Sequence, residues 1–581
     1  RGRPMIAREP PKAERLPIDA ITREVVSHAV VSAAEEMSTA LGRSAYSAII
    51  YDMLDYSCAI FGPRGELIGQ AENLPAQLGV MSSAIAFMLE KFPPDAIGPG
   101  DVFLMNDPYT GATHSLDLVV VAPMYYEERL VGFAGTNAHH LDMGGKVVCT
   151  EAADNTEIFQ EGLILPIVRL YREGIPNDAV FDIIRANVRI PKETIGDLRA
   201  QVAACRTGER RIAEICDRFG AELAARYVSE VLDYTERRVR DEIAGMRQGT
   251  YRAEGHMDPD YFGTGPLKIC AQVDVSGDGV HVDFTGTDEQ VTGSLNNPYA
   301  STVSAVWYAV RCMIDPTIPQ NEGCYRPITC HVPEGSLLNP RRPAAVTIRH
   351  LTQQKAADVL LRALKDAQPS RSAAGCSISF PTWTVGGIDP RSGEPYLASD
   401  IIGGGMGAHH RGDGLSAVDT HMGNCAMMSA EAMEIEFPFR VLKTELVPDS
   451  GGAGRFRGGL AIERSYEFLA PKGTVGVHYV DQTLEETRPW GLDGGQPGKP
   501  AMVTLTEPDG SERRLAGKGA NYPIRQGQML TLRSSGGGGY GPPHERAPDA
   551  LQRDLGEGYV TASAAADDYR AAPPEGSPGS L

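Results

Sequence analysis

The spacing of apolar residues switches repeatedly between a helical and a strand period along the 581-residue chain, and this constrains its fold most strongly. Residues 18–41 and 177–247 carry apolar positions at helical spacing, and Gly42 is the predicted end of the first helix. Between and beyond these stretches, short strand-like runs alternate with Gly- and Pro-containing turns. Separate helical and strand regions predict an α+β fold of several mixed layers.

The same patterns divide the chain into six parts. The predicted parts are an N-terminal arm (1–17), an α+β region with the candidate metal site (18–176), a helical segment (177–247), a mixed α+β middle region (248–430), a β-rich C-terminal region (431–540) and a tail (541–581). We expect the tail to be poorly ordered apart from a short helix near 548–555.

Charge and apolar content argue against several classes of partner. The formal net charge of −20 opposes binding to nucleic acid or to an anionic membrane surface. No window approaches the roughly 18–20 consecutive apolar residues of a membrane span, and the opening residues do not resemble a secretion signal. We therefore expect a cytoplasmic protein whose ten cysteines, spaced singly without a CxxC pair, are reduced thiols.

Polar groups interrupt two of the most apolar strand runs. The stretch GATHSLDLVVVAP, residues 111–123, places His114 and Asp117 at the start of a buried strand, and NAHHLDMGG places His139 and His140 at the end of the next one. An odd separation puts two strand residues on opposite faces, so His114 belongs to a turn before the strand. Two antiparallel strands would bring both sites together.

These residues have the chemistry of a metal site, which needs three or four converging N or O donors. His114, Asp117 and one of the two adjacent histidines meet that need, and Asp55 is a fourth candidate because a carboxylate inside an apolar run is costly unless paired. Asp52 competes with Asp55. The alternatives are a strand cap for Asp117, a hydrogen-bonded core histidine for His140 and an arginine partner for Asp55.

Glycine-rich segments are a second group of candidates. Residues 401–414, IIGGGMGAHHRGDG, would let the backbone approach an anion beside His409, His410 and Arg411, or would form a mobile loop. The segments GGAGRFRGG (451–459) and SSGGGGYG (534–541) are more typical of sharp structural turns than of nucleotide cradles. No P-loop or Rossmann motif is present, so the sequence supplies no ATP site.

Several longer stretches together resemble the hydantoinase B family. They are DYSCAIFGPRGELIGQAENLPAQLG, MNDPYTGATHSLDLVVV, NAHHLDMGG, FQEGLILP, DLRAQVAACRTGERR, IPQNEGCYRPI, GGAGRFRGGL and SSGGGGYGPP, and they extend over nearly the whole chain. That family includes β subunits of ATP-dependent N-methylhydantoinases and lactamases, the corresponding half of 5-oxoprolinase, and a subunit of acetone and acetophenone carboxylases. The chain departs from the pattern at Tyr56, Ala112 and Met143, and none of these changes removes a donor.

The resemblance implies a specific site and a partner. It implies that one divalent ion, Zn, Mn or Fe, is held by Asp55, His114, Asp117 and His139. His140, Asp142 and Glu161 are then candidates for acid/base roles or for orienting the metal ligands.

It further implies that ATP is bound by a hydantoinase A-type subunit, which phosphorylates a lactam or hydantoin that this chain then hydrolyses within a hetero-oligomer. The alternatives are a subunit of an acetone- or acetophenone-type carboxylase, or a scaffold without catalytic residues.

Overall fold

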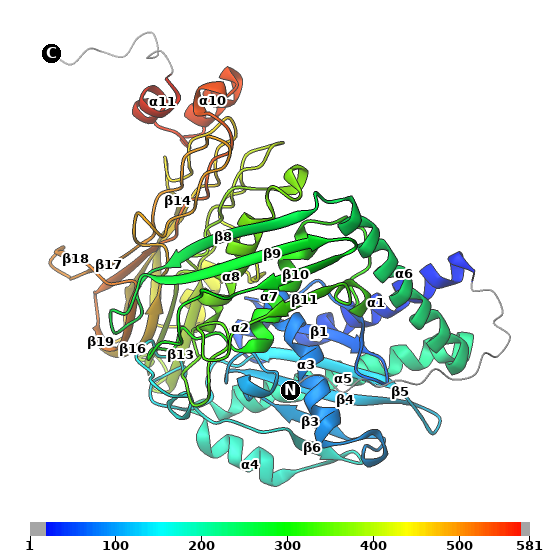
Figure 1. Ribbon diagram of the computed structural model, residues 1–581. Coiled ribbons are helices and arrows are strands. Elements are labelled where there is room, and N and C mark those ends of the chain that lie inside the picture. Colours follow the sequence, from blue (N-terminus) through cyan, green and yellow to red (C-terminus); the bar gives the residue numbers. More distant parts are fainter. Residues whose placement is uncertain (1–18, 571–581) are drawn as a thin grey trace, which may run out of the picture.

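A computed structural model describes residues 19–570 of the chain (Figure 1). The predicted arm, 1–17, and the last part of the predicted tail, 571–581, lie outside the described residues. Helices and four sheets alternate along the chain, and they form the mixed, multilayered α+β fold that the apolar spacing predicts. Among the described residues, no helix combines the length and apolarity needed to cross a membrane.

A seven-stranded antiparallel sheet forms the centre of the first region, with the strand order β2-β1-β5-β4-β3-β6-β7. Its strands are β1 (Tyr56–Phe61), β2 (Leu67–Gln70), β3 (Val102–Met105), β4 (Asp117–Tyr126), β5 (Arg129–His139), β6 (Val168–Arg172) and β7 (Ile175–Pro176). Successive residues of β4 face two different cores: Leu118 and Val120 belong to one, and Val119 and Val121 to the other. Both faces are therefore covered, which explains the nearly unbroken apolar runs.

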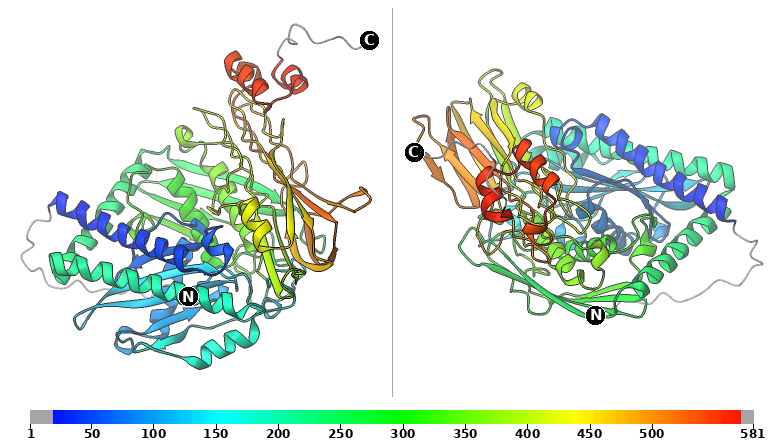
Figure 2. Two further views of the ribbon diagram at one scale, coloured as in Figure 1. Left: turned by 180° about the vertical axis from the view of Figure 1, so that it is seen from behind. Right: turned by 90° about the horizontal axis from the view of Figure 1, so that it is seen from above.

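Helices from two parts of the chain cover these faces. One face packs against α1 (Ala20–Ser44) and α5 (Pro191–Phe219), which lie side by side in Figure 2, and the other packs against α3 (Pro75–Lys91). The short α2 (Ala48–Tyr51) precedes β1, while α4 (Asp178–Asn187) and α6 (Ala221–Gly245) complete the predicted helical segment. Gly42 does not end α1. A Cβ at that position would lie 2.6 Å from the Tyr56 Oη, so the glycine permits close packing inside the helix.

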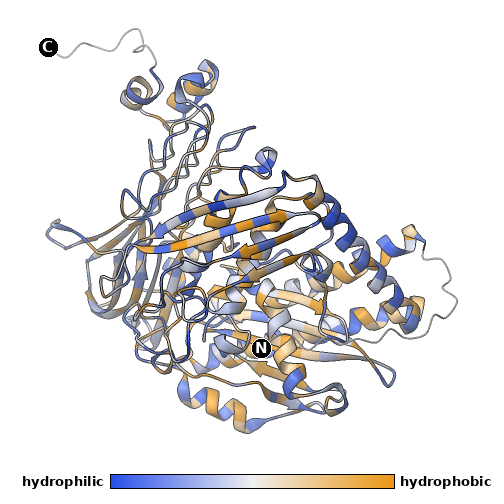
Figure 3. Ribbon diagram, in the orientation of Figure 1, coloured by the Kyte–Doolittle hydropathy of each residue, from blue (hydrophilic) through white to orange (hydrophobic). Residues whose placement is uncertain are grey.

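The middle region combines a second sheet with two helices. Its strand order is β11-β10-β9-β8, and only β10 and β11 are parallel. The strands are β8 (Gly249–Met257), β9 (Leu267–Ser276), β10 (Gly279–Asp283) and β11 (Ile328–His331), and the helices are α7 (Tyr299–Cys312) and α8 (Arg349–Leu364). Strand β9 alternates buried and partly exposed residues, and its buried positions are all apolar, which Figure 3 colours orange. The sheet therefore buries one face, against α8.

Two antiparallel sheets, with the short α9 (Ala430–Glu436), build most of the C-terminal region, and the first of them takes two strands from residues 382–401 of the predicted middle region. One has the order β13-β12-β16-β19 and the other β14-β15-β20-β17-β18. Their strands are β12 (Thr382–Ile388), β13 (Pro395–Ile401), β14 (Phe439–Leu446), β15 (Ile462–Phe468), β16 (Lys472–Tyr479), β17 (Met502–Thr506), β18 (Glu512–Arg514), β19 (Lys518–Arg525) and β20 (Met529–Arg533).

The predicted tail was expected to be poorly ordered, and this prediction is wrong for residues 541–570. They form α10 (Pro548–Gly556), close to the helix predicted at 548–555, and α11 (Ala562–Tyr569), seen at the top of Figure 1. Leu551, Val560 and Tyr569 form a small apolar cluster with Ala453. Tertiary contacts with a distant glycine-rich segment thus order a stretch whose composition is typical of a disordered tail.

Candidate metal centre

Strand register brings three of the predicted donors into one row. Asp117 lies opposite His139 in the β4–β5 pair, and the His139 backbone N donates to the Asp55 carbonyl oxygen at 3.0 Å. Residues directly opposite each other in a sheet point to the same face. Asp55, His139 and Asp117 therefore lie side by side across three strands, on the face that packs against α3.

His114 reaches this row from the turn before β4, as the odd spacing predicts. The Asp117 backbone N donates to the His114 carbonyl oxygen at 3.1 Å, which closes the turn. The His114 Nδ1 donates to the Thr347 carbonyl oxygen at 2.7 Å. That bond leaves the Nε2 lone pair of a neutral imidazole directed at Asp117 and His139.

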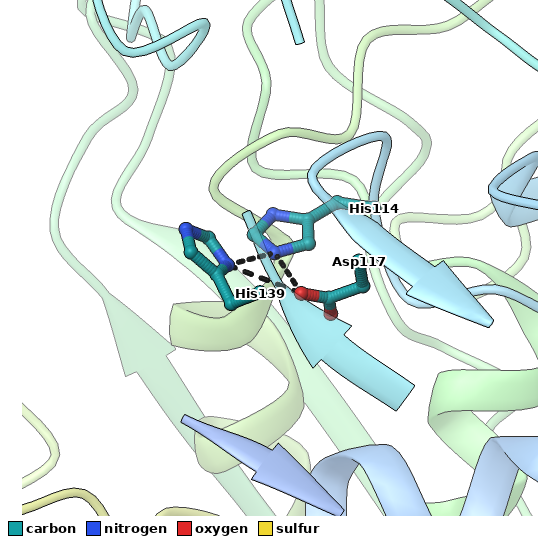
Figure 4. Close-up of side chains that lie close together, drawn as sticks. All are labelled: His114, Asp117 and His139. Carbon is teal, nitrogen blue, oxygen red and sulfur yellow. Dashed lines mark hydrogen bonds and ion pairs between the residues drawn. The ribbon is translucent and has the colours of Figure 1, made fainter. Parts of the chain in front are cut away.

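Three donor atoms form a compact triangle (Figure 4). The His114 Nε2, His139 Nδ1 and Asp117 Oδ1 are each 3.1 Å from the other two. Ligands about 2.1 Å from one divalent ion stand roughly 3 Å apart, so these atoms have the separation and the chemistry of a shared ion's ligands. Asp55 is outside this triangle, because its Oδ1 accepts a hydrogen bond from the Gln77 Nε2 at 2.8 Å.

The charges in this cluster favour a cation. Burial acts to raise the pKa of Asp117, but His114 and His139 hold it well below its ordinary value. Burial lowers the pKa of His139, yet the hydrogen bond with Asp117 and the Asp55 charge outweigh it and raise the value to about 9. Burial raises the pKa of Asp55 to about 6. The cluster therefore stabilises a positive charge between its members.

The predicted acid/base residues lie outside the triangle. The His140 Nε2 is 2.9 Å from the Gln201 Oε1, and Asp142 forms an ion pair with Arg189 at 2.7 Å. Glu161 contacts the loop that carries Thr347. Its Oε1 accepts hydrogen bonds from the backbone N–H groups of Val346 and Thr347, both at 2.8 Å. Burial raises the pKa of Glu161 to about 8. Glu161 thus holds the loop that orients His114.

A cavity of about 50 Å³ opens at the cluster, and several residues that line it are not singled out by the sequence patterns. Glu151 lines it with its Oε1 3.9 Å from the His114 Nδ1, and the start of α8 contributes Arg349, His350 and Gln353. Glu151, His114 and His350 also have potential ligand atoms within 4.8 Å of one another. The α8 residues could have been identified from the sequence, because the polar run RHLTQQK stands at the start of a buried helix.

The glycine-rich segments do not form anion cradles, because their backbones pack against one another. Gly405 donates to Ser535, Gly459 to Met406, and Gly537 to Gly459. A Cβ at Gly405 or Gly459 would collide with neighbouring backbone oxygens, so the glycines are required for this packing. Residues 401–414 belong to this packed layer. The segments 451–459 and 534–541 belong to it as well, so they are structural as predicted, but most of their residues do not lie in turns.

Comparisons with known proteins identify the family to which this chain is similar. The profile of the hydantoinase B/oxoprolinase family matches residues 19–543. A protein from a Pseudomonas species, named as the B-type component of a D-/L-hydantoinase, is 34% identical over 569 residues, covering 95% of each protein.

Two solved structures share the fold. The ATP-dependent caprolactamase of Pseudomonas jessenii superposes with a TM-score of 0.88 at 28% identity, covering 96% of this chain and 98% of the other. A nucleotide-free acetone carboxylase gives a TM-score of 0.87 at 20% identity, covering 94% of this chain and 79% of the other.

Proposed function

The chain belongs to the hydantoinase B/oxoprolinase family, and from this membership we propose that it is the metal-holding subunit of an ATP-dependent cyclic amide hydrolase. The substrate class would be a hydantoin, 5-oxoproline or another lactam. The convergence of His114, Asp117 and His139 at one cavity is the observation that carries the proposal. A histidine and carboxylate cluster of this kind suits hydrolytic chemistry better than a purely structural role.

One divalent ion would be held by His114, Asp117 and His139, with Asp55 as the fourth donor after its carboxylate turns from Gln77. When bound, such an ion lowers the pKa of water or polarises a carbonyl group. The mixed N and O donor set suits Zn, Mn or Fe. Thr347 and Glu161 would keep the His114 ring in the orientation that presents its Nε2.

Glu151 is the best placed proton acceptor at the site. Its carboxylate lines the cavity beside His114, and it is buried, so it would receive a proton from an attacking water without competition from bulk solvent. The predicted candidates His140 and Asp142 have partners away from the cavity, and we propose that they position the loop after β5.

Activation of the substrate would occur on a partner. Amide resonance makes a lactam carbonyl a poor electrophile, whereas phosphorylation of its oxygen creates a good leaving group. The glycine segments of this chain pack against one another and do not form a nucleotide cradle. We therefore propose that phosphorylation occurs on a hydantoinase A-type subunit, which would hold ATP within a hetero-oligomer. The hydantoinase relative, itself named as one component of an enzyme, and the ATP-dependent caprolactamase structure support this arrangement.

Substrate would reach the cavity through an adjoining pocket. A pocket of about 320 Å³ shares Ile49 and Ser399 with the cavity, and the hydrogen-bonded pair of Tyr51 and Glu436 contributes to its wall. The cavity itself holds only a few water-sized molecules, since each needs roughly 10–15 Å³ of such volume. We therefore propose that the activated ring enters from this pocket.

The test is turnover by the chain purified together with its ATP-binding partner. We expect ATP hydrolysis that depends on a lactam or hydantoin and yields an open-chain acid, and we expect chelation to abolish it. Incorporation of bicarbonate into a ketone, without lactam turnover, would instead establish the carboxylase alternative suggested by the shared fold. Full activity of an Asp117→Ala complex would favour the scaffold alternative.

A further inference from the structure

Arg349 is a buried cation beside the candidate metal centre, and part of its guanidinium group has no partner. Arg349 is the first residue of α8, and its side chain is only 4% exposed. The Nη2 lies 3.5 Å from the Asp117 Oδ2, and the Nη1 donates to Gln353, while the Nε has no hydrogen-bond partner. A guanidinium carries five N–H donors, so Arg349 retains unused capacity.

Other polar atoms around the same cavity are also unpaired. The Gln354 Oε1, the His350 Nε2 and the Gln77 Oε1 are buried without hydrogen-bond partners, and all three side chains line the cavity. A buried polar atom left unpaired is unfavourable, because it has given up its hydrogen bonds to water without replacing them. Several such atoms around one cavity indicate a site built for a polar ligand rather than for an apolar one.

The charge of that ligand follows from Arg349. Among the described residues that line the cavity, Arg349 carries the one guanidinium or ammonium group. Together with His139, it offsets the carboxylate of Asp117 when no metal ion is bound. A divalent ion bound to Asp117 would take over that role and leave the guanidinium to bind another oxyanion, because a buried charge without a partner is strongly unfavourable.

We propose that Arg349 binds an anionic oxygen group of the substrate, which is either a carboxylate on the ring or the phosphoryl group added by the partner. This inference rests on the proposed function and narrows it to cyclic amides that are anionic when they enter the cavity. Guanidinium groups suit both oxyanions, since their forked donors match carboxylate and phosphate. A neutral ring would leave the Arg349 donors unpaired.

The first test measures binding to the metal-loaded full chain by calorimetry, with inorganic phosphate and glutamate as probes. Arg349→Gln should weaken binding of at least one probe about 10- to 100-fold, as expected for loss of a hydrogen bond to a charged group. Arg349→Lys should show a smaller loss. The matched control, Arg362→Gln, removes the same charge from an exposed position of α8. This variant should bind both probes with wild-type affinity.

Elemental analysis of each variant shows whether the metal site is intact. Wild-type affinity in a metal-loaded Arg349→Gln chain would overturn the proposal, as would a wild-type chain that binds neither anion.

The second test identifies the source of the oxyanion, using the complex with its partner. It compares kcat/KM for a lactam ring with and without a carboxylate substituent. If Arg349 binds the ring carboxylate, Arg349→Gln lowers the preference for the substituted ring about 10- to 100-fold. If it binds the phosphoryl group, both rings lose activity together and phosphate binding weakens. A wild-type complex that turns over no lactam would refute the proposed function, while the binding test would still decide the role of Arg349.

Discussion

His139 and His140 are neighbours in the chain, but their imidazole rings lie on opposite faces of the first sheet. The His139 Nδ1 is 3.1 Å from the Asp117 Oδ1, whereas the His140 Nε2 is 2.9 Å from Gln201 on α5. Successive residues of an extended chain alternate between faces. Of the two histidines, only His139 is therefore placed to join the candidate metal centre.

The two histidines allow a matched pair of substitutions. His139→Ala should lower metal affinity more than about 100-fold, because even loss of a residue that supports a ligand costs about 10- to 100-fold. His140→Ala should retain the metal and lower the free energy of unfolding by about 1–3 kcal/mol, since it leaves Gln201 without this partner. Metal content by elemental analysis and denaturant unfolding check both. Metal loss confined to His140→Ala would contradict the assignment.

Asp55 is the fourth proposed donor, and Asp52 is its natural control. Asp55→Asn keeps an acceptor for the Gln77 amide, so the fold should persist while metal affinity falls about 10- to 100-fold. Asp52→Asn should leave metal affinity unchanged, because Asp52 caps α2 and does not line the cavity. Titration with Zn, Mn and Fe salts measures both affinities. Equal affinities for the two variants would remove Asp55 from the donor set.

Glu161 should act on the metal through the loop it holds. Glu161→Ala leaves the backbone N–H groups of Val346 and Thr347 unpaired, so Thr347 should no longer orient His114. We expect metal affinity to fall about 10- to 100-fold. Glu161→Gln retains an acceptor and is uncharged, as is a carboxyl that burial keeps protonated. The metal affinity of this variant should therefore stay within about a few-fold of the wild-type value. Indistinguishable metal titrations for the alanine and wild-type chains would refute this role.

His478 should make stability depend on pH, away from the cavity. Burial between Tyr522 and the Ala516 carbonyl lowers the pKa of His478 from 6.5 to about 4. The unfolded state therefore binds more protons between these pH values, and stability is lost as the pH falls through this window. The loss should reach about 3 kcal/mol.

The variant His478→Gln can keep both hydrogen bonds but does not titrate in this range. Its unfolding free energy should fall less steeply between pH 6.5 and pH 4 than that of the wild type. Denaturant unfolding at several pH values gives the two slopes. Parallel slopes for the two proteins would show that the folded state accepts the His478 proton as readily as the unfolded one.

Local patterns in the sequence determined the secondary structure and much of the site. The apolar period predicts the helices and strands because each element depends mainly on which of its own residues can be buried. His114, Asp117 and His139 were identifiable because polar side chains at the ends of apolar strands require a partner. Gly42 and the predicted tail were misread, since close packing against Tyr56 and against Ala453 is invisible in a local pattern.

Tertiary structure alone decided which donors meet and what surrounds them. Strand register places Asp55 and Asp117 on either side of His139 and turns His140 toward α5. Arg349 reaches Asp117 across more than two hundred residues of sequence. Contacts of this kind arise from the packing of whole elements, and a single sequence records the preferences of each element but not the register in which they meet.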